Sequence, residues 1–214
     1  MHKLQRPSPP PDCLQQYQPG RNRWEEVTAT DKSAIWADLV KMQGYRCAYC
    51  ESSLEEAGRH IEHFYQKAQH RFPQKTFDWD NLFGSCNRNE SCGRQKDRTK
   101  HDPNNIIKPD FEDPEYYFQF LTDGRIIIRD DLTQNEYHKA KETLRVFNLN
   151  PNHGPLRNMR QELISTYRRQ IEDIQALSHQ FSKSEIEQML HQELAAISGA
   201  PFETAIKQSL FPKS

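Results

Sequence analysis

The sequence predicts an α+β protein with a small metal-clamped core, an extended proline-rich arm before it and a mainly helical region with one β-hairpin after it. Two cysteine pairs lie in a polar stretch of the first half that has few apolar residues. An Asp-Gly turn joins two short β-type segments near the middle, and helical periodicity dominates the rest. We therefore expect the arm over 1–30, the core over 31–105, and the hairpin with the helices over 106–214.

The composition limits what this chain can be. Only 35% of its 214 residues are hydrophobic, which leaves it short of the ~45–50% apolar content usual in soluble domains, so one large core is not expected. No apolar run reaches the ~20 residues of a membrane-spanning helix, and the first residues lack the apolar segment of a secretion signal. The chain is therefore expected to be cytoplasmic, with reduced thiols. Because the net charge is −1, binding to nucleic acid requires local basic groups or a partner.

Proline content and apolar spacing predict the first elements. Five prolines before residue 20 prevent regular structure in the arm. Thr30 is the expected N-cap of the first helix, and Gly44 is expected to end it. The apolar stripe of this helix consists of Ile35, Trp36, Leu39, Val40 and Met42.

The second half predicts a hairpin followed by helices. The hairpin spans 116–128 around the turn at Asp123-Gly124. Further helices are expected over 136–147, 156–177 and 202–210, and another begins after Ser182 or Ser184, each of which has a glutamate three residues later. From Pro155 onward, the charges of seven basic and seven acidic residues cancel. This region therefore has no net positive charge that would attract phosphate groups. Its apolar stripes predict a bundle packed on the core, a docking surface for another subunit, or both.

The cysteine spacing indicates a structural zinc site. Cys47 and Cys50 form a CxxC pair, and Cys86 and Cys92 form a second pair with a longer spacer. Four thiolates from two turns can surround one tetrahedral zinc ion, which stabilises a small core. Buried free thiols, a redox CxxC and a disulfide are the alternatives; the redox motif lacks its βαβ context and a reducing compartment disfavours the disulfide. Cys13 lies in the arm and is not expected to take part.

Between the cysteine pairs, the Glu62-His63 dipeptide suits phosphodiester hydrolysis with a divalent metal. A carboxylate is a hard ligand for Mg²⁺ or Mn²⁺, and a neutral imidazole can take a proton from water near pH 7. The metal would stabilise the leaving 3′-oxygen. The dipeptide alone is weak evidence, but it lies between the two cysteine pairs. Asn81-Leu82 follows it, a few residues before the second cysteine pair.

These motifs together resemble the HNH nucleases of the zinc-clamped ββα-metal type. The matching residues are Cys47-x-x-Cys50, Ile61-Glu62-His63-Phe64, Asp80-Asn81-Leu82-Phe83 and Cys86 to Cys92 followed by Lys96. The resemblance implies that His63 is the general base, that Glu62 is a ligand of the catalytic Mg²⁺ or Mn²⁺, and that Asn81 holds the connecting loop in shape.

Most of the chain also resembles one subgroup, the HNH subunit of Septu-type and retron-associated anti-phage defence systems. This likeness extends over the opening MHKLQRP, the CAYCE block, DWDNLF, the Asp123-Gly124 hairpin, Leu149-Asn150, Leu156 with Arg160, and Pro201-Phe202. It implies an ABC-like ATPase partner, a nucleic-acid substrate and, beside retrons, a reverse transcriptase with its RNA and DNA. Because the sequence has no long apolar run, no membrane association is expected.

Two positions depart from the HNH pattern. Gly93 follows Cys92 where such nucleases often have a metal-ligating asparagine, and Gln66 stands where they tend to have proline. The further metal ligand therefore stays open among Asn87, Asn89, Gln95 and Asp97. His60 and His70 are interpreted as structural or substrate-contacting residues rather than catalytic ones.

A basic stretch around the second cysteine pair supplies candidate phosphate contacts. The stretch 88–100 has five basic and two acidic residues in a chain of net charge −1. Basic side chains beside the metal can hold phosphates without reading sequence, although a solvated helix face is the plain alternative. The predicted substrate-binding residues are Arg88, Arg94, Lys96 and Arg98.

The sequence therefore predicts a metal-dependent HNH endonuclease that acts as the effector of a defence complex. Its cofactors would be one structural Zn²⁺ and one catalytic Mg²⁺ or Mn²⁺. The alternative is a zinc-stabilised adaptor that binds the ATPase or nucleic acid without cutting it.

Overall fold

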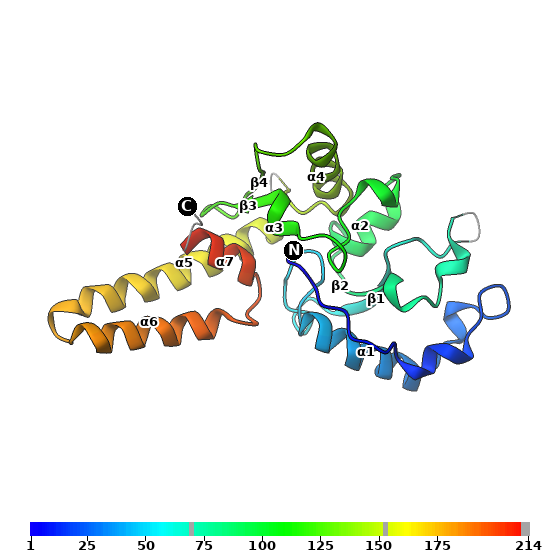
Figure 1. Ribbon diagram of the computed structural model, residues 1–214, viewed down its shortest axis with the longest axis horizontal. Coiled ribbons are helices and arrows are strands. Elements are labelled where there is room, and N and C mark those ends of the chain that lie inside the picture. The colour runs from blue at the N-terminus through cyan, green and yellow to red at the C-terminus, as the bar shows by residue number, and fades with distance from the viewer. Residues whose placement is uncertain (69–70, 152–153, 211–214) are drawn as a thin grey trace. The chain divides into compact units, whose positions relative to one another are not determined.

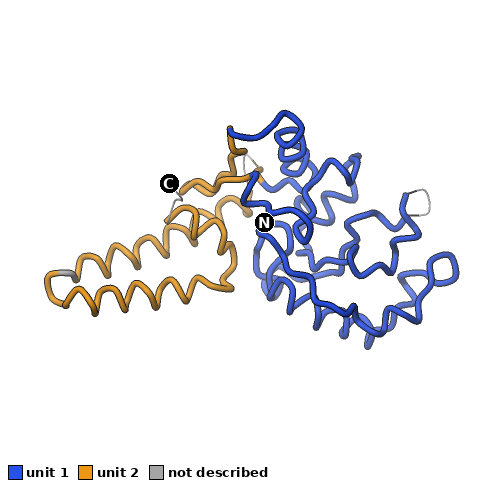
Figure 2. Tube along the Cα trace, in the orientation of Figure 1, with its two compact units in different colours: residues 1–117, 131–149 blue, residues 118–130, 150–214 orange. Residues whose placement is uncertain are grey.

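The computed structural model describes residues 1–68, 71–151 and 154–210, and the chain divides into two compact units (Figure 2). Unit 1 consists of Met1–Tyr117 and Asp131–Leu149, and unit 2 of Phe118–Asp130 and Asn150–Ser214. The chain thus leaves unit 1 and returns to it, so the division differs from the three consecutive segments that we expected. Within the described residues, no helix combines the length and apolar character needed to cross a membrane.

Helix α1 (Ala29–Gln43) opens the regular structure of unit 1 (Figure 1). Its N-cap is Thr28, whose side chain accepts a hydrogen bond from the backbone N–H of Asp31. The expectation of Thr30 as the cap is wrong, because an acidic residue three positions after Thr28 completes the first turn there. Gly44 ends the helix as predicted, with a positive φ of 65°.

A two-stranded sheet and a short helix form the centre of unit 1. Strand β1 (Arg59–His63) pairs antiparallel with β2 (Leu82–Cys86), in a register from Arg59 opposite Cys86 to His63 opposite Leu82. Helix α2 (Cys92–Arg98) follows β2 and packs on it. All five residues of β2 are buried, so this strand lies in the interior of the unit.

The N-terminal arm packs against the core of unit 1. Leu4 and Leu14 are buried at 1% and 6% exposure. The guanidinium of Arg6 donates to the backbone oxygens of Trp79 and Leu82, at 2.6 and 3.0 Å. The helical elements of the arm before α1 are two short 3-10 turns, η1 (Asp12–Gln16) and η2 (Trp24–Glu26), which agrees with its proline content.

The segment that returns to unit 1 contains helix α4 (Gln134–Phe147), which packs on α2. Thr133 and Glu136 form a reciprocal capping box at its start. At its other end, the ring of Phe147 stacks on Tyr49 with 4.2 Å between centroids. The shorter turns of unit 1 are η3 (Pro73–Lys75), η4 (Trp79–Asn81), η5 (Pro103–Asn105) and α3 (Pro114–Tyr117).

Unit 2 contains the predicted hairpin and helices. Strands β3 (Phe118–Phe120) and β4 (Ile126–Ile128) pair antiparallel, and α5 (Pro155–Ala176) packs against α6 (Lys183–Ile197) and α7 (Glu203–Leu210). The turn η6 (Leu177–His179) follows α5. Ser182, rather than Ser184, caps α6, with Glu185 completing the capping box. The structure is therefore α+β, as predicted, with helices and two small antiparallel strand pairs.

Candidate active site beside a four-cysteine cluster

Four cysteines converge at one point in unit 1. Cys47 and Cys50 come from the turn after α1, Cys86 ends β2, and Cys92 begins α2. Their sulfur atoms all lie within 4.8 Å of one another. The Sγ atoms of Cys50 and Cys86 are 3.9 Å apart, close to the ~3.8 Å that follows from a tetrahedral zinc with Zn–S bonds of ~2.3 Å. These cysteines are thus positioned to hold a metal ion.

The chemistry of the cluster also fits a soft divalent cation. The four side chains are buried, with exposures of 4% or less. Burial raises the pKa of Cys47 and Cys92 well above the ordinary thiol value. At Cys50, hydrogen bonds from the neighbouring thiols outweigh burial and lower the pKa well below that value. Burial thus opposes the ionisation of Cys47 and Cys92, and a cation bound among the sulfurs would favour their thiolate forms. Cys13 lies apart from the cluster and donates to the backbone oxygen of Asp31.

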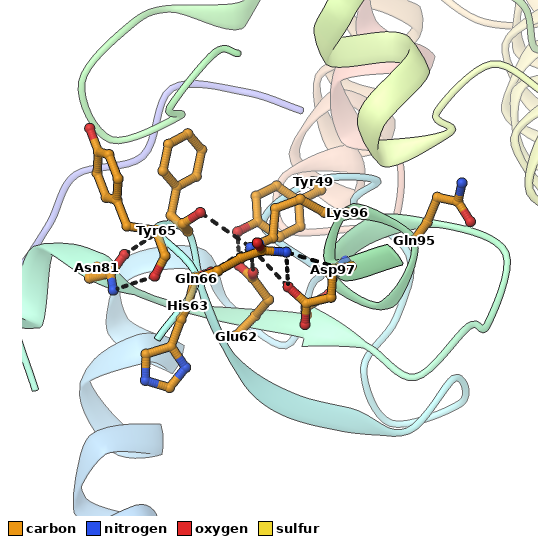
Figure 3. Close-up of polar contacts among 12 residues, drawn as sticks. Tyr49, Glu62, His63, Tyr65, Gln66, Asn81, Gln95, Lys96 and Asp97 are labelled. Atoms are coloured by element: carbon orange, nitrogen blue, oxygen red, sulfur yellow. Dashed lines mark hydrogen bonds and ion pairs between the residues drawn. The ribbon is translucent and has the colours of Figure 1, made fainter. Parts of the chain in front are cut away.

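The carboxylate of Glu62 is held from both sides in the interior (Figure 3). Glu62 is only 2% exposed. One carboxylate oxygen lies 2.5 Å from the ammonium of Lys96, and the other accepts a short hydrogen bond from the hydroxyl of Tyr49. Tyr49 belongs to the CxxC turn and Lys96 to α2, so two segments attached to the cysteine cluster fix the same carboxylate.

Lys96 is buried instead of lying on the surface, as phosphate contact would require. It has 0% exposure, and besides Glu62 its ammonium donates to the backbone oxygens of His63 and Phe64 at 2.5 and 3.2 Å. The reason is helical spacing: Lys96 is four residues after Cys92, so the helix face that directs the cysteine inward also directs the lysine inward. The structure thus gives Lys96 an internal role beside both candidate catalytic residues.

His63 ends β1 with an imidazole that is fixed and neutral. Its Nε2 lies 3.0 Å from the backbone oxygen of Thr76; because a carbonyl only accepts, Nε2 carries the proton and Nδ1 keeps the lone pair. The Trp24 ring meets the imidazole edge to face, at 4.5 Å between centroids. Burial, followed by the nearby ammonium of Lys67, lowers the pKa of His63 to about 3.

Acidification is expected to destabilise the protein partly through His63. Its pKa is 6.5 as an ordinary imidazole and about 3 in the folded chain, so between these values the unfolded state binds more protons. The stability due to the neutral ring is complete above the upper value and is lost as the pH falls towards the lower one. Urea unfolding across this window checks the effect: His63→Gln should lose less stability on acidification than wild type, and equal losses would contradict it.

Asn81 holds the loop between β1 and β2. Its side-chain oxygen accepts from the backbone N–H of Tyr65 at 2.6 Å, and its amide donates to the backbone oxygens of Tyr65 and Lys75 at 3.0 and 2.8 Å. The side chain is fully buried. One residue therefore joins both ends of the loop that follows His63 and carries Thr76.

A pocket of about 390 Å³ adjoins the two candidate catalytic residues. Its lining consists of His60, Ile61, Glu62, His63, Gln66, Lys67, Ala68, Arg71 and Asp97. Lys67 and Arg71 were not among the predicted substrate-binding residues, although two basic residues soon after His63 were the available signal. None of the predicted set Arg88, Arg94, Lys96 and Arg98 lines this pocket. Arg94 donates to Asn89, and Arg98 donates to the backbone oxygen of Asn89.

The site does not present a preformed place for the catalytic Mg²⁺ or Mn²⁺. Glu62 already has Lys96 and Tyr49 as partners, and a divalent cation at its carboxylate would repel the adjacent ammonium. Gly93 leaves no room for a side-chain ligand, since a Cβ there would lie 2.4 Å from Cγ of Glu62. Over the described ranges, the four cysteines are the one group of three or more Cys, His, Asp or Glu side chains close enough to hold a metal.

The open candidates for a further ligand are dispersed. Of these, Asp97 alone lines the pocket. The oxygen of Asn87 lies 3.0 Å from Nδ1 of His60. Asn89 accepts from Arg94, and Gln95 donates to Thr99. His70 lies outside the described residues.

Comparison with known proteins gives one informative similarity. No protein-family model matches the chain. The chain is 30% identical over 124 residues to the Septu protein PtuB of Bacillus thuringiensis. The similarity extends over 56% of this chain and 42% of that protein, so the chain matches less than half of the length of its relative.

Proposed function

We propose that the protein is an HNH-type endonuclease that hydrolyses phosphodiester bonds in nucleic acid as the effector of an anti-phage defence complex. The observation that carries the proposal is His63, a neutral imidazole with a fixed tautomer at the end of β1 and in the lining of a pocket, in a unit that also contains the four-cysteine cluster. The order of β1, β2 and α2 in the chain supports a ββα core. The similarity to the Septu protein PtuB supports the defence setting.

In this proposal His63 takes the proton from the attacking water. The bond from Nε2 to Thr76 leaves the lone pair on Nδ1, and the backbone oxygen that receives Nε2–H supports the charge that develops on the ring. Asn81 fixes the loop that supplies this oxygen. The chemistry then requires a phosphate held next to the ring, with its leaving 3′-oxygen stabilised by a positive group.

Glu62, Lys96 and Tyr49 act in this proposal as a positioning group. Lys96 contacts the carboxylate of Glu62 and the backbone of His63, so it sets the position of β1 where the strand ends. Tyr49 holds the same carboxylate from the CxxC turn. Displacement of the cysteine cluster would thus move the base as well as loosen the fold.

The proposed structural metal and the proposed catalytic metal rest on different support. Zinc is the proposed occupant of the four-cysteine cluster, where it supplies structural cross-linking. The need for Mg²⁺ or Mn²⁺ stays a prediction from the resemblance to HNH nucleases, and no step is derived through it. The proposed partners are an ABC-like ATPase and, in a retron setting, a reverse transcriptase with its RNA and DNA.

A non-catalytic adaptor is the second candidate, and one observation favours it. Both oxygens of Glu62 have internal partners, so the residue expected to bind the catalytic metal is not free to do so. An adaptor would keep the zinc cluster and bind the ATPase or nucleic acid without cutting.

The end groups of the product test the proposed function. The protein, alone and with its ATPase, is incubated with plasmid DNA and with RNA in the presence of Mg²⁺ or Mn²⁺. We expect internal cleavage that leaves 5′-phosphate and 3′-hydroxyl ends, because water attacks phosphorus and the 3′-oxygen leaves. Products with 2′,3′-cyclic phosphate ends would contradict the water-activating role of His63. Intact substrates under every condition would favour the adaptor.

A further inference from the structure

Two basic residues line the pocket beside His63. Several other basic side chains of unit 1 are paired with a carboxylate: Arg6 pairs with Asp110, and Lys139 pairs with Glu112. Lys67 and Arg71 line the pocket, and neither side chain makes a hydrogen bond or ion pair within the described part of the chain. Their positive charge is therefore available to a ligand.

The acidic groups of the same pocket do not cancel this charge. Glu62 is neutralised by Lys96 at 2.5 Å. Asp97, the remaining carboxylate of the lining, lies 3.2 Å from the same ammonium. Lys96, Glu62 and Asp97 together carry a charge of −1, so with Lys67 and Arg71 the group has a net charge of +1 beside a neutral imidazole, an arrangement that attracts an anion.

The geometry points to Lys67 and Arg71 as the residues that bind the phosphate oxygens of a nucleic-acid backbone and hold a phosphodiester next to His63. The inference rests on the proposed function and deepens it by naming the substrate contacts. An arginine can bind two phosphate oxygens at once, and a lysine acts as a mobile point charge, so the pair can follow the phosphate as its geometry changes. Arg94 and Arg98, which α2 carries, are instead bonded to Asn89.

Lys67 and Arg71 would also supply the positive charge that phosphodiester hydrolysis requires. Glu62 is not free to hold a metal ion, yet the phosphoryl oxygens and the leaving oxygen need a positive group nearby. Lys67 and Arg71 are the basic residues that line the pocket with His63. They belong to the loop held by Asn81, so the same loop would position the base and the phosphate.

Salt-dependent binding tests the inference separately from cleavage. Binding of the full chain to a fluorescein-labelled single-stranded DNA, and to RNA of the same sequence, is measured by fluorescence anisotropy without added Mg²⁺ or Mn²⁺. The variant is Lys67→Ala/Arg71→Ala. The control is Lys41→Ala/Lys183→Ala, which removes the same charge from two exposed side chains outside the pocket.

The expected result is a change in slope. Each lost phosphate contact makes the plot of log K against log salt shallower by about 0.7 on a single strand, so the pocket variant should be shallower by about 1.4. The control should keep the wild-type slope, and thermal melting should show both variants folded. Equal slopes for variant and wild type, or no binding by wild type, would overturn the inference. Binding that follows the expected pattern without any cleavage would instead contradict only the proposed function.

Discussion

Replacement of Cys50 by serine is expected to unfold unit 1. The cysteine cluster joins the turn after α1, the end of β2 and the start of α2, and these are the elements that carry Tyr49 and Lys96 to Glu62. Structural zinc in small domains contributes ~10–16 kcal/mol of binding free energy that appears as folding free energy. A typical domain is stable by ~5–15 kcal/mol in total, which is similar to this contribution. A weakened zinc site therefore leaves little net stability.

The measurement combines zinc content with thermal unfolding. Wild type should contain one zinc per chain, and Cys50→Ser should contain less and melt without a cooperative transition. Cys13→Ser is the matched control, because Cys13 is a half-buried thiol outside the cluster and should keep its zinc and its melting temperature. A Cys50→Ser protein that is stable, free of zinc and fully active would disprove the structural role of the metal.

Replacement of His63 by alanine is expected to remove cleavage while the protein stays folded. A positioned general base contributes about 10²–10⁴-fold to the rate, so single-turnover cleavage should fall by that factor. His63 is the candidate because its tautomer is fixed by Thr76 and it lines the pocket. Nucleic-acid binding should change little, because Lys67 and Arg71 remain.

The control for this variant is His138→Ala, which removes an exposed histidine from α4. Both variants should keep their zinc and melt cooperatively. If His63→Ala cuts as fast as wild type under these conditions, His63 is not the base. If both variants and wild type cut at the same background rate, the nuclease proposal itself fails.

Local patterns predicted the elements whose signals are local. The hairpin and the helices of the second half depend on spacing of a few residues, which a sequence displays directly, whereas spacing alone left Ser182 and Ser184 as alternative caps of α6. The cysteine cluster was also predictable, because four cysteines in a small core have few other uses. The cap at Thr28 was missed although the signal, Asp31 three residues later, was present.

Other features depend on contacts between distant segments, which spacing does not reveal. Lys96 lies in a basic run, which predicts a phosphate contact, yet helical spacing from Cys92 places its side chain in the interior. Arg6 is fixed against the core because its guanidinium donates hydrogen bonds to the backbone oxygens of Trp79 and Leu82, which are more than 70 residues away in the sequence. The free cations of the pocket were missed for the same reason: which basic residue lacks an acidic partner is decided only in the folded chain.

The return of the chain to unit 1 affects when this unit can fold during synthesis and how it can be truncated. The segment Asp131–Leu149 brings Phe147 onto Tyr49 and α4 onto α2. The ribosome must therefore synthesise β3 and β4 before unit 1 can be completed. A fragment stopped at Tyr117 would lack Phe147, the ring that stacks on Tyr49. To isolate this half, one would splice residue 117 to residue 131 with a short linker rather than truncate the chain.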